Sequence, residues 1–121
     1  MQKKTTLVLG ASLNPRRFSY KAVVRLNFHK IPVIAVGLKK GRIGDTEIRM
    51  PFPDVSDIHT VTMYVSPRHQ SFYSDFILAL KPVRVIFNPG TENTELMDRL
   101  KSNGIGVVEK CMLVMLAKGE F

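Results

Sequence analysis

A short run of residues, 5–10, constrains the fold of this chain more than any other feature. It reads Thr-Thr-Leu-Val-Leu-Gly, so β-branched and apolar side chains occupy both faces of the strand that it predicts, and a glycine ends it. A strand that is apolar on both faces is typical of a parallel sheet covered by helices on each side. The run therefore predicts an α/β architecture.

The rest of the chain continues this alternation of strands and helices. Further apolar runs predict strands over 32–36, 59–65, 83–87 and 106–108, and residues 39–45 are predicted to form a basic, glycine-rich loop. Apolar residues at helical spacing predict helices over 20–30, 69–80, 91–102 and 111–118, with Ser19 and Thr91 as expected N-caps. We therefore expect a single domain over residues 1–121. Its predicted fold is a Rossmann-like, doubly wound, mainly parallel five-stranded sheet with helices on both faces.

Charge and cysteine content narrow the function classes. Lysine and arginine number 18 against 10 acidic residues, a formal charge of +8, which suits an anionic partner or, alternatively, only a basic surface. Cys111 is the one cysteine, so no internal disulfide forms, and the apolar run after the basic residues 1–4 is too short for an export signal. Both observations favour the cytoplasm. No segment approaches the ~20 apolar residues of a membrane span, and the sequence is compatible with a homodimer or a larger enzyme partner without requiring either.

Five loops are expected to converge on one edge of the sheet. In open parallel sheets, ligands bind at the carboxyl ends of the strands, near the point where the strand order reverses. The loops that follow the predicted strands are 10–19, 37–45, 66–68, 88–90 and 109–111.

The first of these loops has the composition of a phosphate site. Gly10 ends the strand, Ser12 and Asn14 offer polar side chains, Arg17 supplies a bidentate cation, and Ser19 stands at the expected helix start. Amide groups at a helix N-terminus attract phosphate, and the helix dipole adds to that attraction. The alternative is an ordinary strand-to-helix turn with two solvated arginines.

The cofactor suggested by this loop is not a standard dinucleotide. A G-x-G-x-x-G loop would place glycines where Ser12 and Pro15 stand, and the second strand is not followed by the acid that binds the ribose of NAD. Lys39 and Lys40 occupy that region instead. Cations there suit a ribose that carries a phosphate, as in NADP and coenzyme A, and the residues do not distinguish these two.

The order of several short motifs resembles the small bacterial CoA-binding domain proteins, which are similar to the N-terminal domain of the succinyl-CoA synthetase α subunit. The opening motif, residues 10–15 followed by Arg17, Ser19 and Tyr20, is the most specific part of the resemblance. Weaker matches follow in the right order at 32–34, 64–67, 88–90 and 107–111. The first loop departs from the glycine-rich loop of the synthetase, and the parts of the synthetase that hold its phosphohistidine are not in this chain.

The resemblance implies a fold and a ligand set. It implies a Rossmann-like domain that binds CoA or an acyl-CoA. Phosphates and adenosine would lie against Ser12, Leu13, Asn14 and Pro15, with Lys39 and Lys40 at the ribose phosphate, Val65 and Ser66 near the adenine, and Phe87, Asn88 and Pro89 beside the remaining arm.

No constellation of residues predicts catalysis. His29, His59 and His69 show no metal spacing, no cysteine cluster exists, and we expect no metal site. Cys111 has the position of a reactive thiol, because it opens the last predicted helix beside Lys110; the alternative is a small packed side chain. If it is reactive, it could form a mixed disulfide with the CoA thiol.

Three functions follow from these observations. The leading one is a CoA-binding module without chemistry of its own that acts as a carrier, sensor or regulatory subunit. An NADP-dependent oxidoreductase is a second reading, although the missing glycines and the short chain disfavour it. A basic nucleic-acid-binding domain is the third, although the cations form no recognised motif.

Overall fold

Seven strands form one mixed sheet in the computed structural model, which describes residues 4–121. Residues 1–3, part of the basic start considered above for an export signal, lie outside the described residues. The strands are β1 (Thr6–Ala11), β2 (Val33–Gly37), β3 (Gly41–Ile43), β4 (Thr46–Arg49), β5 (Thr60–Met63), β6 (Arg84–Phe87) and β7 (Gly106–Glu109). The helices are α1 (Phe18–Phe28), α2 (Ser71–Leu80), α3 (Thr94–Ser102) and α4 (Met112–Ala117), with a 3-10 turn, η1, at Pro67–His69.

The expectation of five strands was wrong. The order is β3-β4-β2-β1-β5-β6-β7; β3 pairs with β4 antiparallel, and all other neighbours are parallel. The region that we predicted as a loop after β2 is therefore a hairpin closed by Gly44 and Asp45. Ile43 and Ile48 bury its inner face, and Arg42 and Glu47 form a cross-strand ion pair at 3.8 Å on the outer face.

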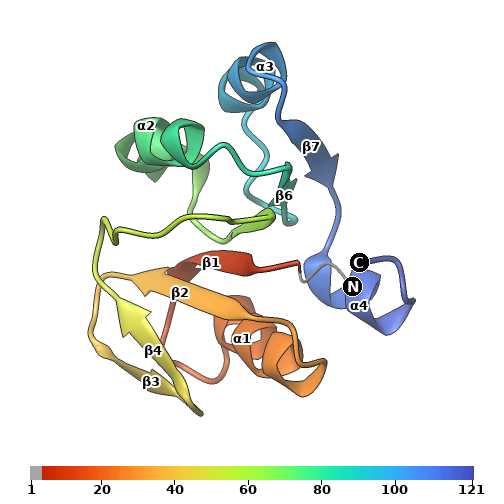
Figure 1. The fold of residues 1–121 in the computed structure, drawn as a ribbon. Helices are drawn as coiled ribbons and strands as arrows, with labels where there is room; N and C mark the ends of the chain where they lie inside the picture. Colours follow the sequence, from red (N-terminus) through yellow and green to blue (C-terminus); the bar gives the residue numbers. More distant parts are fainter. Residues whose placement is uncertain (1–3) are drawn as a thin grey trace.

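Helices cover both faces of the sheet, as the all-apolar β1 predicts (Figure 1). Leu7 and Leu9 of β1 point into the layer of α2 and α3, whereas Val8 points into the layer of α1 and α4. The first layer packs around side chains such as Phe87, Tyr73, Ile77 and Leu100, and the second around Val23, Leu26, Met112 and Met115.

The strand order reverses between β1 and β5, and this places the ligand edge. From β1 the chain crosses to β2 on one side, and β5 then returns to the other side of β1. The carboxyl ends of β1 and β5 therefore diverge into loops on opposite faces and leave a crevice between them.

Each of the four helices begins one to three residues away from its predicted start. Helix α1 starts at Phe18 with Arg17 in the N-cap position, so Ser19 lies within the first turn and is buried. Helix α3 starts at Thr94, and Asn93 caps it in place of Thr91. The predicted helix 69–80 is divided between η1 and α2.

Within residues 4–121, no helix is long and apolar enough to cross a membrane.

Candidate functional site

Three adjoining hollows form a groove along the carboxyl edge of the sheet, which we call the carboxyl-edge groove. The largest, about 690 Å³, extends from the first loop to Lys39 and to α2. The second, about 450 Å³, shares Gly10, Ser12, Arg17, Tyr64 and Ser66 with the first and reaches Thr91. The third, about 130 Å³, shares Phe18, Tyr64 and Pro89 with the second and ends at Cys111. The groove therefore runs past the ends of β2, β1, β5, β6 and β7 in turn.

Two glycines allow the chain to pass closely at the centre of this edge. Gly10 has φ +94°, and a Cβ there would lie 3.0 Å from the carbonyl carbon and oxygen of Tyr64. A Cβ on Gly37 would overlap the carbonyl oxygen of Ala11. A larger residue at either position would push the β1 loop away from its neighbour and change the floor of the groove.

The loop after β1 arranges its own hydrogen bonds and leaves the start of α1 open. The Asn14 amide donates to Ser12 Oγ at 3.1 Å, and the Arg16 and Arg17 amides donate to Asn14 Oδ1 and O, both at 3.0 Å. No side chain caps α1. Within residues 4–121, the amide groups of Phe18 and Ser19, which line the groove, find no acceptor. Such a helix start is a site for an anion.

The charge of the groove has the same sign throughout. Arg17 and Lys39 line it, and no carboxylate does so among the described residues. His69 also lines it, and its Nδ1 lies 3.1 Å from Ser66 Oγ. An anionic ligand in this groove would meet cations and amide donors without a repelling acid.

Asn88 holds the far end of the groove together. Its side chain is buried and donates to Thr62 Oγ1 at 2.8 Å and to the Met63 carbonyl at 2.9 Å. Its Oδ1 accepts from the Met112 amide at 2.8 Å and so caps α4. All three bonds of this amide are used inside the protein, which makes Asn88 a residue that positions β5, β6 and α4.

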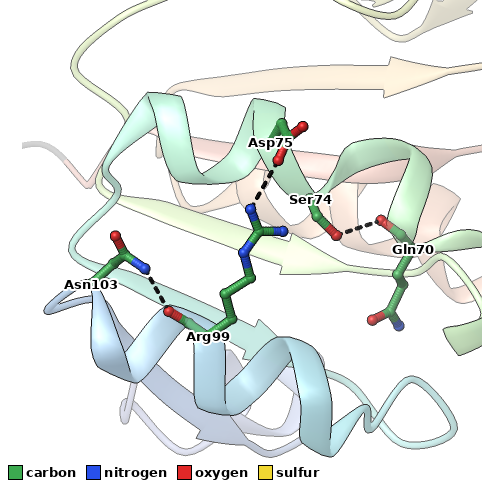
Figure 2. A network of polar contacts seen from close by, with 5 residues as sticks. All are labelled: Gln70, Ser74, Asp75, Arg99 and Asn103. Atoms are coloured by element: carbon green, nitrogen blue, oxygen red, sulfur yellow. Dashed lines mark hydrogen bonds and ion pairs between the residues drawn. The ribbon is translucent and has the colours of Figure 1, made fainter.

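The Gln70 side chain likewise joins two segments through hydrogen bonds, the residues between β5 and η1 and the loop before α3. It is fully buried; its Nε2 donates to the carbonyls of Val65 at 2.9 Å and Thr91 at 2.7 Å, and its Oε1 accepts from Asn93 at 3.1 Å. Figure 2 shows the backbone of the same residue accepting from Ser74 at 3.2 Å at the start of α2. This network fixes the wall of the groove that carries Val65 and Ser66.

Tyr64 lies at the centre of the groove and lines all three hollows. Its hydroxyl is buried and has no hydrogen-bond partner among residues 4–121. Burial raises the pKa of this phenol. Tyr64 therefore contributes to the wall of the groove, while its hydroxyl is buried away from the surface that a ligand would contact.

The structure brings most of the predicted site residues to this groove. Those that line it are Gly10, Ser12, Leu13, Arg17, Ser19, Lys39, Val65, Ser66, Asn88, Pro89 and Cys111. Lys40 lines a neighbouring hollow over the β3–β4 hairpin, Pro15 lines a separate groove between α1 and α4, and Asn14 is exposed in the loop. Phe87 is buried in the core beneath the edge.

Several residues that line the groove were not among those predicted. Phe18, Leu38, Tyr64, His69, Phe72 and Tyr73 belong to it. Phe72 is 59% exposed, and its ring centroid lies 5.1 Å from that of Phe52, so an aromatic wall flanks the first hollow. The signal available for Tyr64 was its place at the end of a buried strand. By contrast, Phe72 and Tyr73 belong to a predicted helix whose apolar spacing is typical of core packing, so nothing in the sequence indicates that they line a groove.

The residues 4–121 contain no group of three or more His, Cys, Asp or Glu side chains placed to hold a metal ion. What the edge provides instead is a basic, acid-free groove beside an open helix start.

The fold places the chain in the Rossmann-like α/β class, and a family match makes this class specific. The CoA binding domain family matches residues 4–117. The chain therefore belongs to the CoA-binding domain family. No curated protein matches it.

Solved structures agree with this assignment at the level of the fold. The chain is similar to a crystal structure of an uncharacterised protein, with 45% identity, full coverage of both chains and a TM-score of 0.96. It is also similar to the protein cell-free ID.343 from Thermus thermophilus, with 25% identity, coverage of 98% of this chain and 91% of that one, and a TM-score of 0.87. A hypothetical protein from Pyrococcus horikoshii OT3 shares the fold at 23% identity, with coverage of 97% and 84% and a TM-score of 0.86.

Proposed function

We propose that this protein binds coenzyme A or an acyl-CoA in the carboxyl-edge groove and acts as a carrier, sensor or regulatory module without chemistry of its own. The observation that carries the proposal is the uncapped start of α1, which opens beside Arg17 onto a groove lined by no acid in the described part of the chain. Membership of the CoA-binding domain family supports the choice of ligand.

The phosphates of the ligand would lie at the start of α1. The open amide groups of the first turn bind phosphate oxygens, and the exposed Arg17 guanidinium can grip two of them at once. The exposed side chains of Lys39 and Lys40 follow β2 next to this position and would bind the phosphate on the ribose.

The two ends of the ligand would take the two ends of the groove. Val65, Leu13 and Phe72 provide apolar walls for the adenine in the largest hollow. The narrower hollow between Phe18 and Pro89 would take the pantetheine arm and bring its thiol toward Cys111.

The groove-lining side chains of the described residues are assigned to binding. The Ser66–His69 pair is exposed, and no carboxylate among the groove-lining residues of the described chain orients the imidazole. We therefore assign no catalytic residue and propose that the protein delivers or reports the bound ligand.

Isothermal titration of the whole protein with CoA tests the proposal, with Arg17→Ala as the main variant. Loss of the charge-assisted bonds to phosphate should weaken binding by about 2 kcal/mol, roughly thirtyfold in Kd. Arg16→Ala is the matched control: Arg16 is also exposed, but it lines none of the three hollows, so its variant should bind almost as the parent does.

The same titration includes ligands that separate the competing readings. Dephospho-CoA, which lacks the ribose phosphate, should bind more weakly than CoA if Lys39 and Lys40 act as proposed. Tighter binding of NADPH than of CoA would instead favour the oxidoreductase reading. No binding of CoA or acyl-CoA at ~1 mM would refute the proposal.

Treatment with the disulfide of CoA tests the position of the thiol end. Cys111 is half-buried and lines the narrow hollow. Attack by its thiolate on the CoA disulfide would form a mixed disulfide and release one CoA thiolate. We expect intact-mass analysis to show one CoA adduct in the parent and none in Cys111→Ser; an unmodified parent would remove Cys111 from the proposed site.

A further inference from the structure

A second groove lies on the surface between α1 and α4, and Pro15 is the one residue lining it that was predicted to contact CoA. It has a volume of about 650 Å³ and apolar walls formed by Val24, Phe28, Leu113, Leu116 and Ala117. Lys21, Arg25 and His29 line it as well. We call it the α1–α4 groove.

Leu116 belongs to the core and Leu113 packs against it, but two other apolar side chains of this groove, Val24 and Phe28, belong to neither core cluster. Each helix already buries its inner face against the sheet, with Ala22, Val23 and Leu26 on α1 and Met112 and Met115 on α4. Phe28 is nevertheless 72% exposed and Val24 44% exposed. Contiguous apolar side chains on a surface mark an interaction site more often than scattered ones do.

The charge around the groove is uncompensated. The first 44 residues of the chain hold ten lysines and arginines and no acidic residue. Neither Lys21 nor Arg25 belongs to either ion pair formed within residues 4–121. The opposite helix layer differs: there Arg99 of α3 pairs with Asp75 of α2 at 3.0 Å, as Figure 2 shows.

We propose that the α1–α4 groove binds an acidic amphipathic helix of a partner protein. The groove runs between two helices, so a third helix can lay an apolar face into it with anchors at i, i+3, i+4 and i+7. Acidic residues beside those anchors would face Lys21 and Arg25 and supply the missing opposite charge.

The shape and charge argue against two other occupants. A flat bilayer would reach the exposed ring of Phe28 but not Leu116, which is 7% exposed. A second copy that offered the same groove would bring the cations Lys21 and Arg25 of both copies together, and one that offered the exposed acids Glu95 and Asp98 of α3 would lack anchors, because the large apolar residues of α3 are buried. The test below contains no CoA, so its result is independent of the proposed CoA binding.

The test uses a fluorescent helical peptide of about 16 residues, built from leucine, alanine and glutamate with leucine at the anchor positions. Fluorescence anisotropy with the whole protein should give a Kd in the micromolar range, and NMR shifts should map to Val24, Phe28 and Leu113. Arg25→Glu should weaken binding about tenfold. Lys101→Glu is the matched control, since Arg25 and Lys101 are each a basic residue in the last turn of a helix; it should change Kd less than twofold.

Phe28→Asn separates the apolar contribution from the charge and should also weaken peptide binding several-fold. No binding at ~1 mM, equal binding of a peptide with lysine in place of glutamate, or shifts mapped elsewhere would overturn the proposal. Two further results would overturn it. One is a dimer of the parent in sedimentation experiments that Phe28→Asn converts to a monomer. The other is binding of the parent to phosphatidylserine vesicles that Phe28→Asn abolishes, while the peptide does not bind.

Discussion

The helices that begin at the ligand edge differ in how their first amide groups are satisfied. The α3 start is capped by Asn93 Oδ1, which accepts from the Leu96 amide at 3.2 Å, and the α4 start by Asn88 Oδ1. Helix α2 has no side-chain cap; it continues from η1, and the Gln70 amide at its N-cap position donates to the Pro67 carbonyl at 3.2 Å. Helix α1 has no side-chain cap either; the Arg17 amide at its N-cap position donates to the Asn14 carbonyl at 3.0 Å, but the amides of Phe18 and Ser19 find no acceptor within residues 4–121.

The capped starts of α3 and α4 therefore serve the fold, whereas the uncapped start of α1 remains open to a ligand. Backbone donors near a protein interior are almost always paired, so an open set is the exception that needs an explanation. The caps on α3 and α4 are themselves held by buried partners, Gln70 and Thr62. A cap on α1 would occupy the amide groups that we assign to phosphate.

Asn88→Ala has the largest expected effect on stability, because it removes the side chain that caps the start of α4. The variant leaves the Thr62 hydroxyl, the Met63 carbonyl and the Met112 amide without this partner at a buried position. We expect the free energy of unfolding to fall by about 3 kcal/mol, measured by urea denaturation.

Asn103→Ala is the comparison for that experiment. Asn103 also donates through its side chain, to the Arg99 carbonyl at 2.8 Å, but at an exposed position on α3. We expect the free energy of unfolding of Asn103→Ala to fall by only about 0.5 kcal/mol. Equal losses for the two variants would mean that the buried network around Asn88 is not what holds the edge.

Asn93→Ala removes the cap of α3 and should have a smaller effect, about 2 kcal/mol in the free energy of unfolding. A lost N-cap costs about 1 kcal/mol, and Gln70 Oε1 loses its partner as well. Ser102→Ala, which removes an exposed hydroxyl bond at the other end of α3, serves as the control. CoA affinity should change little, and a large loss of affinity would show that α3 takes part in binding directly.

The sequence predicted the parallel part of the architecture because the signals for it are local. The all-apolar residues of β1 and the alternation of strands and helices predict a covered parallel sheet, and its carboxyl edge then gathers the loops. The β3–β4 hairpin was missed because each strand buries a single isoleucine, at 43 and 48, which is too weak a pattern to distinguish from a loop. The dipeptide Gly44-Asp45, which closes the hairpin, was the available signal.

The details of the site depend on contacts between distant residues, which no local pattern specifies. Thr91, Asn93 and Thr94 are all residues that cap helices, and Asn93 takes the role because Gln70 reaches it across the loop. Gln70 itself is a polar residue in the first turn of the predicted helix 69–80, and nothing in its neighbours distinguishes a fully buried amide from a solvated one. The end of a buried strand was the sequence signal for Tyr64, but its contact with all three hollows depends on loops that are distant in the sequence.

Arg17→Asn converts α1 into a capped helix like α3 and gives the smallest but sharpest effect. Arg17 already has the extended N-cap conformation, φ −77° and ψ 142°, in which an asparagine side chain reaches the amides of the first turn. Relative to Arg17→Ala, which lacks both charge and cap, the variant should unfold with a free energy about 1 kcal/mol higher. It should nevertheless bind CoA more weakly than Arg17→Ala, because the new cap competes with phosphate for the same donors. Urea denaturation and isothermal titration of the two variants measure both quantities. If Arg17→Asn gains stability without this further loss of affinity, the open amides of α1 are not where the ligand binds.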